Sequence, residues 1–461
     1  MDDRVERDSL GAVHIPKTAY YGPQTARAAA NFIDSGLKMP GGLLRALAMI
    51  KCQAAAANEA LALLDGKRAA AIQSAAREVM QGAFDDQFVV DVFQTGSGTS
   101  TNMNMNEVLA ARANERLTGK RGGKAPVHPN DHVNLGQSSN DVIPSAIHVA
   151  ALIAVKACLV PGLRRLENSL KRQAERLAGI RKIGRTHLQD AVPIFLGQEF
   201  GGYARQTTLS TQRVESAAED LKELALGGTA VGNGLNTHPH FAGRVISGIA
   251  GETGIDFREA HNHFEAQGAR DAAVAFSGAL KTVSVSLGKI ANDIRWLSSG
   301  PRCGLGELLL EPLQPGSSIM PGKVNPIVPE AMLQIAAQVI GNDAAITIAG
   351  QGGSFELNTM LPLIAYNLLQ SITILGDGAD FMAEKCIDGL TANATNCAAC
   401  VDKSLALATY LVPELGYDQA AEIAGKAHAA GKTIRQILEA EALLPPHKIA
   451  RYFNTDLKAD P

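Results

Sequence analysis

A regularly spaced series of apolar residues near the middle of the chain constrains the fold most strongly. Large apolar side chains recur there in alternating steps of four and three, at Phe276, Leu280, Val283, Leu287, Ile290, Ile294 and Leu297. This spacing predicts one long helix with an apolar stripe suited to bundle packing. Small residues such as Ala279, Ser284 and Gly288 cover much of the remaining surface, which is typical of a helix buried on all sides. The pattern leaves open whether its neighbours belong to the same chain or to other subunits.

Four further segments have similar apolar periodicity: Ser145 to Leu177, Phe200 to Leu226, Pro329 to Ile348 and Asn358 to Glu384. Because alternating strand patterns are almost absent, we predict a mainly α fold. We divide the chain into an N-terminal domain (1–135), a central helical-bundle domain (136–392) and a small C-terminal helical domain (393–461). In the last domain, helices are expected from Asp418 to Ala430 and from Thr433 to Leu443, with a break at Gly431.

Composition and charge narrow the class of protein. The 461 residues are 46% hydrophobic and 19% charged, which indicates a soluble protein with a large core, and the net charge of −3 argues against a nucleic-acid partner. The first nine residues are too charged for a signal peptide. The apolar stretch from Ala146 to Leu163 contains Lys156 and Pro161, so we interpret it as a buried helix and expect no membrane span. Six scattered cysteines suit a reducing, cytoplasmic location.

Two spacings resemble metal or redox sites, but neither is complete. Cys397 and Cys400 form a CxxC pair on an expected helix, without a second pair or a nearby histidine. His128 and His132 are four residues apart with Asp131 between them, yet Pro129 argues against an intact helix at that point. A metal role for either group remains the less favoured alternative, and we predict no metal and no organic cofactor.

The segment from Gly316 to Pro326 concentrates reactive residues in a loop. Its sequence is GSSIMPGKVNP, preceded by Pro315, and the prolines exclude a regular helix. Such a loop can turn several backbone N–H groups toward an anion, and Lys323 adds a positive charge. A serine amid converging amides can act as a base, because its alkoxide is stabilised where it forms. The alternative is an ordinary surface loop rich in turn residues.

Three more blocks accompany this loop: QTGSGTSTNMN at residues 94–104, HPND at 128–131 with QSSND at 137–141, and GRTHLQD at 184–190. Together with GSSIMPGKVNP, in this order, they resemble the motifs of the fumarase/aspartase superfamily. These lyases eliminate water or an amine from C4 dicarboxylates or their adducts. The resemblance extends through nearly the whole chain.

The resemblance implies a role for each motif residue. Ser317 is the expected base for the C3 proton, Lys323 and Asn325 hold the carboxylate that gains charge, and His187 transfers a proton at the leaving oxygen. Glu330 is expected to orient His187. The substrate-binding residues implied are Ser97, Thr99, Ser138, Ser139, Asn140, Thr186, Ser318 and Asn325. A second dicarboxylate site at His128, Asn130 and Asp131 is in doubt, because Ala125-Pro126 replaces a basic residue found in some fumarases.

The resemblance also implies an assembly and a reaction. Members of the superfamily form homotetramers around a twenty-helix core, and each active site draws on three chains. The Ser138-Ser139-Asn140 run resembles the fumarase branch, which hydrates fumarate reversibly to L-malate by anti addition through an aci-carboxylate, without a metal. The run Ile327-Val328-Pro329 resembles the aspartase branch, so aspartate ammonia-lyase is the alternative. A structural protein of crystallin type is a third possibility, which the complete set of motif residues disfavours.

Overall fold

The computed structural model describes residues 3–453, which form two compact units. Unit 1 consists of Met1–Pro161, Ser210–Ser284 and Ile335–Asp377, and unit 2 consists of Gly162–Leu209, Val285–Gln334 and Gly378–Pro461. Residues 1–2 and 454–461, which fall within the predicted N- and C-terminal domains, lie outside the described residues. The three-domain division at residues 135 and 392 stays a prediction.

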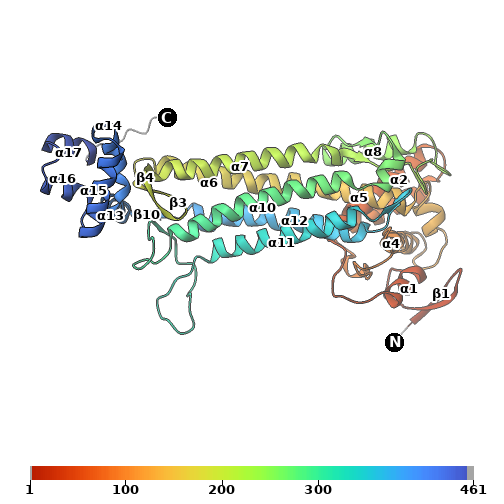
Figure 1. Ribbon diagram of the computed structural model, residues 1–461. Helices are drawn as coiled ribbons and strands as arrows, with labels where there is room; N and C mark the ends of the chain where they lie inside the picture. Colours follow the sequence, from red (N-terminus) through yellow and green to blue (C-terminus); the bar gives the residue numbers. More distant parts are fainter. Residues whose placement is uncertain (1–2, 454–461) are drawn as a thin grey trace. The chain divides into compact units, whose positions relative to one another are not determined.

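The fold is mainly α, as predicted from the sequence (Figure 1). The α-helices are α1 (Pro23–Asn31), α2 (Gly41–Ala60), α3 (Gly66–Met80), α4 (Thr99–Thr118), α5 (Ser139–Ala154), α6 (Val160–Arg176), α7 (Leu196–Ala218), α8 (Phe241–Thr253), α9 (His263–Gly268), α10 (Asp271–Leu297), α11 (Ile327–Gly350), α12 (Leu361–Met382), α13 (Ala394–Lys403), α14 (Val412–Leu415), α15 (Tyr417–Ala430), α16 (Ile434–Ala440) and α17 (Pro446–Phe453).

The strands of residues 3–453 form two-stranded pairs only. The antiparallel pairs are β1 (Asp3–Asp8) with β2 (Gly11–Pro16), β3 (Arg181–Thr186) with β4 (Gln189–Phe195), β7 (Leu308–Leu309) with β10 (Thr391–Ala392), and β8 (Gly353–Ser354) with β9 (Leu357–Asn358). The strands β5 (Glu223–Leu224) and β6 (Arg258–Glu259) are parallel. The hairpins β1–β2 and β3–β4 were not predicted from the sequence, and the second of these carries predicted site residues.

The apolar stripe predicted from Phe276 to Leu297 lies on α10 and is a core surface. Its first six members are fully buried, and Leu297 is nearly so. The chain itself covers this stripe, which answers the question that the sequence pattern left open. On the same helix, Val285 is 59% exposed and Trp296 is 46% exposed. Apolar surface available to another subunit therefore lies beside the stripe and not on it.

Unit 1 contains a helical core around α2. This helix packs against α3, α5 and α8, and its buried residues include Leu43, Leu47 and Ile50. Its alanine-rich second half favours the helical state, because alanine has the highest helix propensity. The next helix, α3, begins where Asp65 accepts hydrogen bonds from the backbone N–H groups of its first turn. Local sequence and tertiary packing thus specify the same elements.

Among residues 3–453, two helical stretches are long and apolar enough to cross a membrane by length and composition: residues 139–176 and 327–350. In the first stretch, 72% of the most apolar window is buried inside the protein. A buried helix was predicted here, because Lys156 and Pro161 interrupt the apolar stretch. Core helices of globular proteins commonly have this composition.

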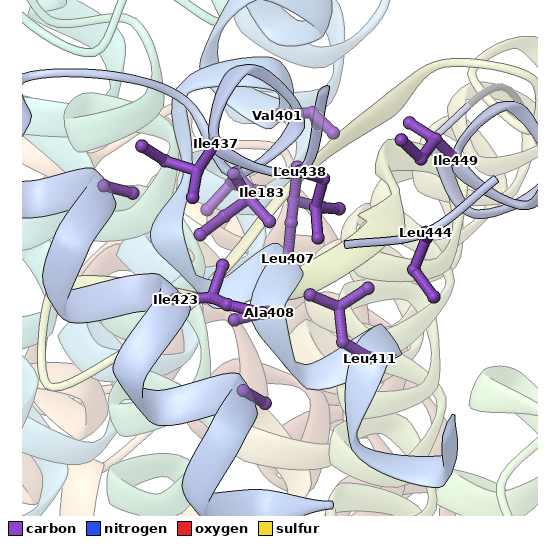
Figure 2. Close-up of a cluster of buried hydrophobic side chains, with 13 residues drawn as sticks. Ile183, Val401, Leu407, Ala408, Leu411, Ile423, Ile437, Leu438, Leu444 and Ile449 are labelled. Carbon is purple, nitrogen blue, oxygen red and sulfur yellow. The ribbon is translucent and has the colours of Figure 1, made fainter. Parts of the chain in front are cut away.

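The C-terminal helices of unit 2 have their own apolar core (Figure 2). Val401, Leu407, Ile423 and Leu438 converge there, and Ile183 joins them from strand β3. The helices predicted on either side of Gly431 are present as α15 and α16, and Gly431 ends α15 in the left-handed conformation. The last helix, α17, was not predicted from the sequence. Because Ile183 belongs to this core, the small C-terminal core supports one end of the β3–β4 hairpin.

Replacing Leu287 by alanine tests the buried stripe. We expect Leu287→Ala to lower the free energy of unfolding by about 2–5 kcal/mol, because it leaves a cavity in a packed core. The matched control is Val285→Ala on the exposed face of α10, where a change within about 0.5 kcal/mol is expected for the isolated chain. Urea unfolding followed by circular dichroism compares the two, and equal losses would show that the stripe is no more buried than its flank.

Candidate active site

The loop from Gly316 to Pro326 leads from β7 toward α11, and it is not helical. The hydroxyl oxygen of Ser317 accepts hydrogen bonds from the backbone N–H of Ile319 (3.2 Å) and of Met320 (2.9 Å). This is the converging-amide arrangement expected around the serine. A negative charge on that oxygen would be stabilised by both donors, so Ser317 has surroundings that favour an alkoxide.

The two ends of this loop are joined near Lys323. The ammonium group of Lys323 donates to Oδ1 of Asn325 (2.7 Å), and the amide of Asn325 donates to the backbone oxygen of Gly316 (2.7 Å). The N–H of Gly316 donates to the backbone oxygen of Lys323 (2.8 Å). A Cβ at position 316 would lie 2.6 Å from that oxygen, so glycine is required there. Ser317, Lys323 and Asn325 therefore belong to one closed loop, while Ser318 beside them is exposed.

His187 lies at the tip of the β3–β4 hairpin. Thr186 pairs with Gln189 across the hairpin, so His187 and Leu188 form a two-residue turn. Both have positive φ angles, 55° and 59°, as a type I′ turn requires. Non-glycine residues adopt this conformation at a cost, and such strain is found where the surrounding structure imposes it. Thr186, His187 and Leu188 are all exposed, so the imidazole is accessible.

Glu330 belongs to the first turn of α11, four residues after Pro326. Its backbone N–H donates to the backbone oxygen of Pro326 (3.1 Å). Within residues 3–453 no hydrogen bond or ion pair joins Glu330 to His187 in the single chain. The orienting role of Glu330 therefore stays a prediction.

The polar donors of unit 1 converge where α4 and α5 begin. The hydroxyl oxygens of Ser97 and Thr99 are 2.7 Å apart, and those of Thr99 and Ser139 are 2.6 Å apart. The side-chain amide of Asn140 donates to the backbone oxygen of Ala230 (2.8 Å). The hydroxyl of Ser139 also donates to Oδ1 of Asn140 (3.5 Å), so four of the predicted substrate-binding residues form one chain of neutral polar groups.

Ser138 has a defined structural task in this group. It caps α5: its hydroxyl oxygen accepts from the N–H of Asn140 (3.2 Å), and its own N–H donates to the carboxylate of Asp141 (2.9 Å). This reciprocal arrangement is a capping box. The hydroxyl hydrogen of Ser138 is not used by these bonds, so the predicted contact with substrate is compatible with capping.

The segment that carries the possible second site forms a single π-helical turn, Pro129–Val133. Pro129 occupies the first position of this turn, where proline lacks only an N–H that a helix leaves unbonded anyway, and the turn does not continue into a longer helix. Nδ1 of His128 accepts from the N–H groups of Asn130 and Asp131, both at 3.1 Å. The carboxylate of Asp131 lies 3.4 Å from the same nitrogen.

The predicted residues thus fall into two groups, each inside one unit. Unit 1 holds Ser97, Thr99, Ser138, Ser139 and Asn140, as well as His128, Asn130 and Asp131. Unit 2 holds Thr186, His187, Ser317, Ser318, Lys323, Asn325 and Glu330. Among residues 3–453 there is no cluster of three or more histidine, cysteine, aspartate or glutamate side chains arranged to hold a metal ion.

Comparisons with known proteins relate the chain to a family of lyases. A family model described as "Lyase" matches residues 11–341, and one described as "Fumarase C C-terminus" matches residues 407–456. The chain is 53% identical over 433 residues to the class II fumarate hydratase of Nitrosomonas europaea, covering 94% of both proteins. It is 50% identical over 456 residues to that of Thermosynechococcus vestitus, covering 99% of this chain and 98% of the relative.

A solved structure agrees with the sequence relatives. The crystal structure of class II fumarase from Schistosoma mansoni superimposes with a TM-score of 0.95 at 40% identity, covering 99% of this chain and 100% of that one. The chain belongs to the class II fumarase family of lyases. The relatives span it almost from end to end, so the similarity covers both units.

Beneath the unit 1 donors, this member of the family contains a buried lysine that the sequence analysis missed. Lys51 on α2 is fully buried, and its ammonium group donates to Oδ1 of Asn134 (2.9 Å) and to Oε1 of Gln137 (3.0 Å). Burial lowers the pKa of Lys51 to about 7, and the charge of Asp141 opposes this shift. A single lysine in an alanine-rich helix does not show from the sequence that its side chain will be buried.

Asp141 is the second buried ionisable residue at this place. Besides the N–H of Ser138, its carboxylate accepts from those of Gly227 (3.1 Å) and Thr229 (3.0 Å). Burial raises the pKa of Asp141 to about 6, against the effect of these hydrogen bonds and of Lys51. The capping-box spacing from Ser138 to Asp141 is a sequence signal that was available. Asp141 therefore fixes the Ser138–Asn140 turn to the loop that follows residue 226.

Replacing Lys51 by methionine tests the burial of its charge. With a folded-state pKa near 7, below the unfolded value, the unfolded chain binds a proton between pH 7 and 10 that the folded chain does not bind. The free energy of unfolding therefore rises with pH through that range, by at most about 1.4 kcal/mol per pH unit. Below pH 7 the buried Lys51 is charged, and its whole cost to stability is present.

We expect the free energy of unfolding of Lys51→Met, relative to that of the wild type, to be highest at pH 7 and to fall at pH 8 and 9. Urea unfolding midpoints at the three pH values provide the measurement. The exposed Lys67→Met on α3 is the control, for which the difference from the wild type should not vary with pH. A Lys51→Met difference that is constant from pH 7 to 9 would contradict the buried-charge interpretation.

Proposed function

We propose that this chain is a class II fumarate hydratase, which adds water reversibly to fumarate to give L-malate. Relatives of this name share 50–53% of its residues over nearly its full length. The observation that carries the proposal concerns Ser317. Its hydroxyl oxygen accepts hydrogen bonds from two backbone N–H groups, in a loop that also contains Lys323 and Asn325. Such a group is suited to removing a weakly acidic proton beside a carboxylate.

In the dehydration direction, Ser317 as its alkoxide takes the C3 proton of L-malate. The electron pair of the C–H bond moves into the adjacent carboxylate, which becomes the aci-carboxylate, and Lys323 and Asn325 stabilise the added charge. The electrons then return to form the double bond as the C–O bond breaks. His187 supplies the proton that converts the leaving hydroxide into water, and Glu330 orients that imidazole.

The neutral donors of unit 1 are assigned to substrate binding: Ser97, Thr99, Ser138, Ser139 and Asn140, joined by Thr186, Ser318 and Asn325 of unit 2. Hydroxyl and amide groups hold a dicarboxylate by hydrogen bonds without the strong charge pairing that would retain product. His128, Asn130 and Asp131 are assigned to a second dicarboxylate site. No metal or organic cofactor takes part in this mechanism.

We further infer a cytoplasmic homotetramer with a twenty-helix core, in which each active site combines residues of three chains. Large apolar side chains on the long helices support an assembly of this kind. On α11, Ile340 is 42% exposed and Ile348 is 66% exposed, and Val285 and Trp296 are exposed on α10. Surfaces of this kind are typical of protein–protein contacts. Neither nucleic acid nor a membrane is an expected partner.

Substrate preference tests the proposed function against its alternative. We expect purified protein to convert L-malate to fumarate far faster than it converts L-aspartate. A malate hydroxyl both donates and accepts hydrogen bonds, which suits His187 and the Ser138–Ser139 pair, whereas an ammonium group only donates. Fumarate absorbance is followed with each substrate at equal concentration, together with ammonia release.

Ammonia release that matches or exceeds malate dehydration would replace the proposal by aspartate ammonia-lyase. Turnover of neither substrate by a folded oligomer would instead favour a structural protein.

Replacing Ser317 by alanine tests the assignment of the base. Ser317→Ala should lower kcat by at least about a hundredfold while the protein still folds and assembles, because it removes the group that accepts the C3 proton. Ser318→Ala is the matched control in the same loop and should raise KM more than it lowers kcat. Size-exclusion chromatography shows whether each variant assembles, and near-normal kcat in an assembled Ser317→Ala protein would exclude Ser317 as the base.

A further inference from the structure

The hairpin that carries His187 is held by a buried carboxylate to which the proposed mechanism gives no role. Glu307 is fully buried, and its oxygens accept from both terminal nitrogens of Arg185, Nη1 to Oε2 at 3.0 Å and Nη2 to Oε1 at 2.7 Å. A bidentate arginine–carboxylate pair fixes orientation as well as distance. Because Arg185 lies two residues before His187, this contact holds the hairpin close to its tip.

The backbone of Glu307 is itself fixed on both sides. Its N–H donates to the backbone oxygen of Leu297 (2.8 Å), and its backbone oxygen accepts from the N–H of Asn393 (2.9 Å). Strand β7 follows immediately and pairs with β10. From there the chain runs on to Gly316 and the Ser317 loop. Glu307 thus connects the hairpin that bears His187 to the segment that leads into the loop that bears the base.

A local irregularity in the hairpin allows a second cation to reach the same carboxylate. The strand register shifts between Ile183 and Arg185, and Gly184 lies at the shift, where a Cβ would be 2.8 Å from the backbone oxygen of Val192. Side chains three residues apart project to opposite faces of a regular strand. Here the Nζ of Lys182 also lies 3.0 Å from Glu307, and a bulge is a known means of redirecting a side chain.

The turn at His187 requires such support. Both of its residues are non-glycine with positive φ, a conformation that is unfavourable for L-residues with a side chain, and both are exposed. A strained turn keeps its conformation only when the structure around it determines that conformation. The Arg185–Glu307 pair is the buried polar contact nearest to the tip along β3.

We propose that Glu307 is a positioning residue for His187. Through Arg185 it fixes the hairpin so that the imidazole stays at the place from which it delivers its proton. This inference rests on the proposed function of His187. A purely structural role would instead make Glu307 contribute to stability without any particular connection to His187.

A double-mutant cycle between Glu307→Gln and His187→Asn separates these possibilities. We expect Glu307→Gln alone to lower kcat by roughly 10–100-fold, with a smaller change in KM for L-malate and with a shift in the limb of the pH–rate profile that His187→Asn abolishes. In the His187→Asn background the same change should lower kcat by less than threefold, because residues that act through one another are not additive.

The matched control is Glu199→Gln. Glu199 accepts from Lys182 (2.9 Å) but is not bonded to Arg185, so its loss should change kcat by less than threefold. Glu307→Asp keeps the charge with a shorter reach and should recover part of the lost kcat. If Glu307→Gln does not assemble, Glu307→Asp takes its place in the cycle, where its loss should likewise vanish in the His187→Asn background.

Hydrogen exchange distinguishes failure of this inference from failure of the proposed function. Glu307→Gln should speed amide exchange at residues 183–192 at least tenfold while leaving residues 276–290 unchanged, whatever reaction the protein catalyses. Additive losses in the double mutant, an unchanged kcat in Glu307→Gln, or unchanged hairpin exchange would each overturn the positioning role. A wild type inactive on L-malate, with hairpin exchange still faster in the variant, would overturn the proposed function alone.

Discussion

The arrangement of unit 2 depends on the buried ion pairs around Glu307. A carboxylate removed from water is tolerated only when charges and hydrogen bonds compensate it, and Arg185 and Lys182 do so here at 2.7–3.0 Å. Lys182 is itself buried and has a second carboxylate partner in Glu199. Four side chains of balanced charge thus form a rigid base beneath an exposed, strained turn. Rigid support beneath an exposed reactive group keeps that group in place while it remains accessible.

In unit 1, other groups hold the predicted site residues in position. Its donors, Ser97, Thr99, Ser139 and Asn140, are neutral, and their positions follow from helix starts, a capping box and the carboxylate of Asp141. The buried charges of Lys51 and Asp141 lie beneath this surface and not on it. The depressed pKa of the lysine and the raised pKa of the aspartate show that their burial is costly. Proteins keep such costly buried charges where the charges fix the positions of neighbouring groups.

Sequence was most informative where a residue's role follows from its local spacing. The stripe on α10, the non-helical Ser317 loop and the helices around Gly431 follow from apolar periodicity, proline chemistry and glycine conformation. The β3–β4 hairpin was missed because its turn contains His187 and Leu188 in place of the usual glycine or asparagine. Glu307 and Lys51 were missed because their partners are distant in sequence, and a single charged residue does not reveal that it will be buried.

The proposed reaction assigns different tasks to the two groups of site residues. The neutral donors of unit 1 are hydroxyls and amides, and the hydroxyls of Ser97, Thr99 and Ser139 are joined to one another by hydrogen bonds. The unit 2 group has Ser317 with its two backbone N–H donors, the cation Lys323 and the exposed His187, but few neutral donors. Elimination beside a carboxylate needs both, because the charge that develops must be held while a proton leaves at one carbon and oxygen departs at the next.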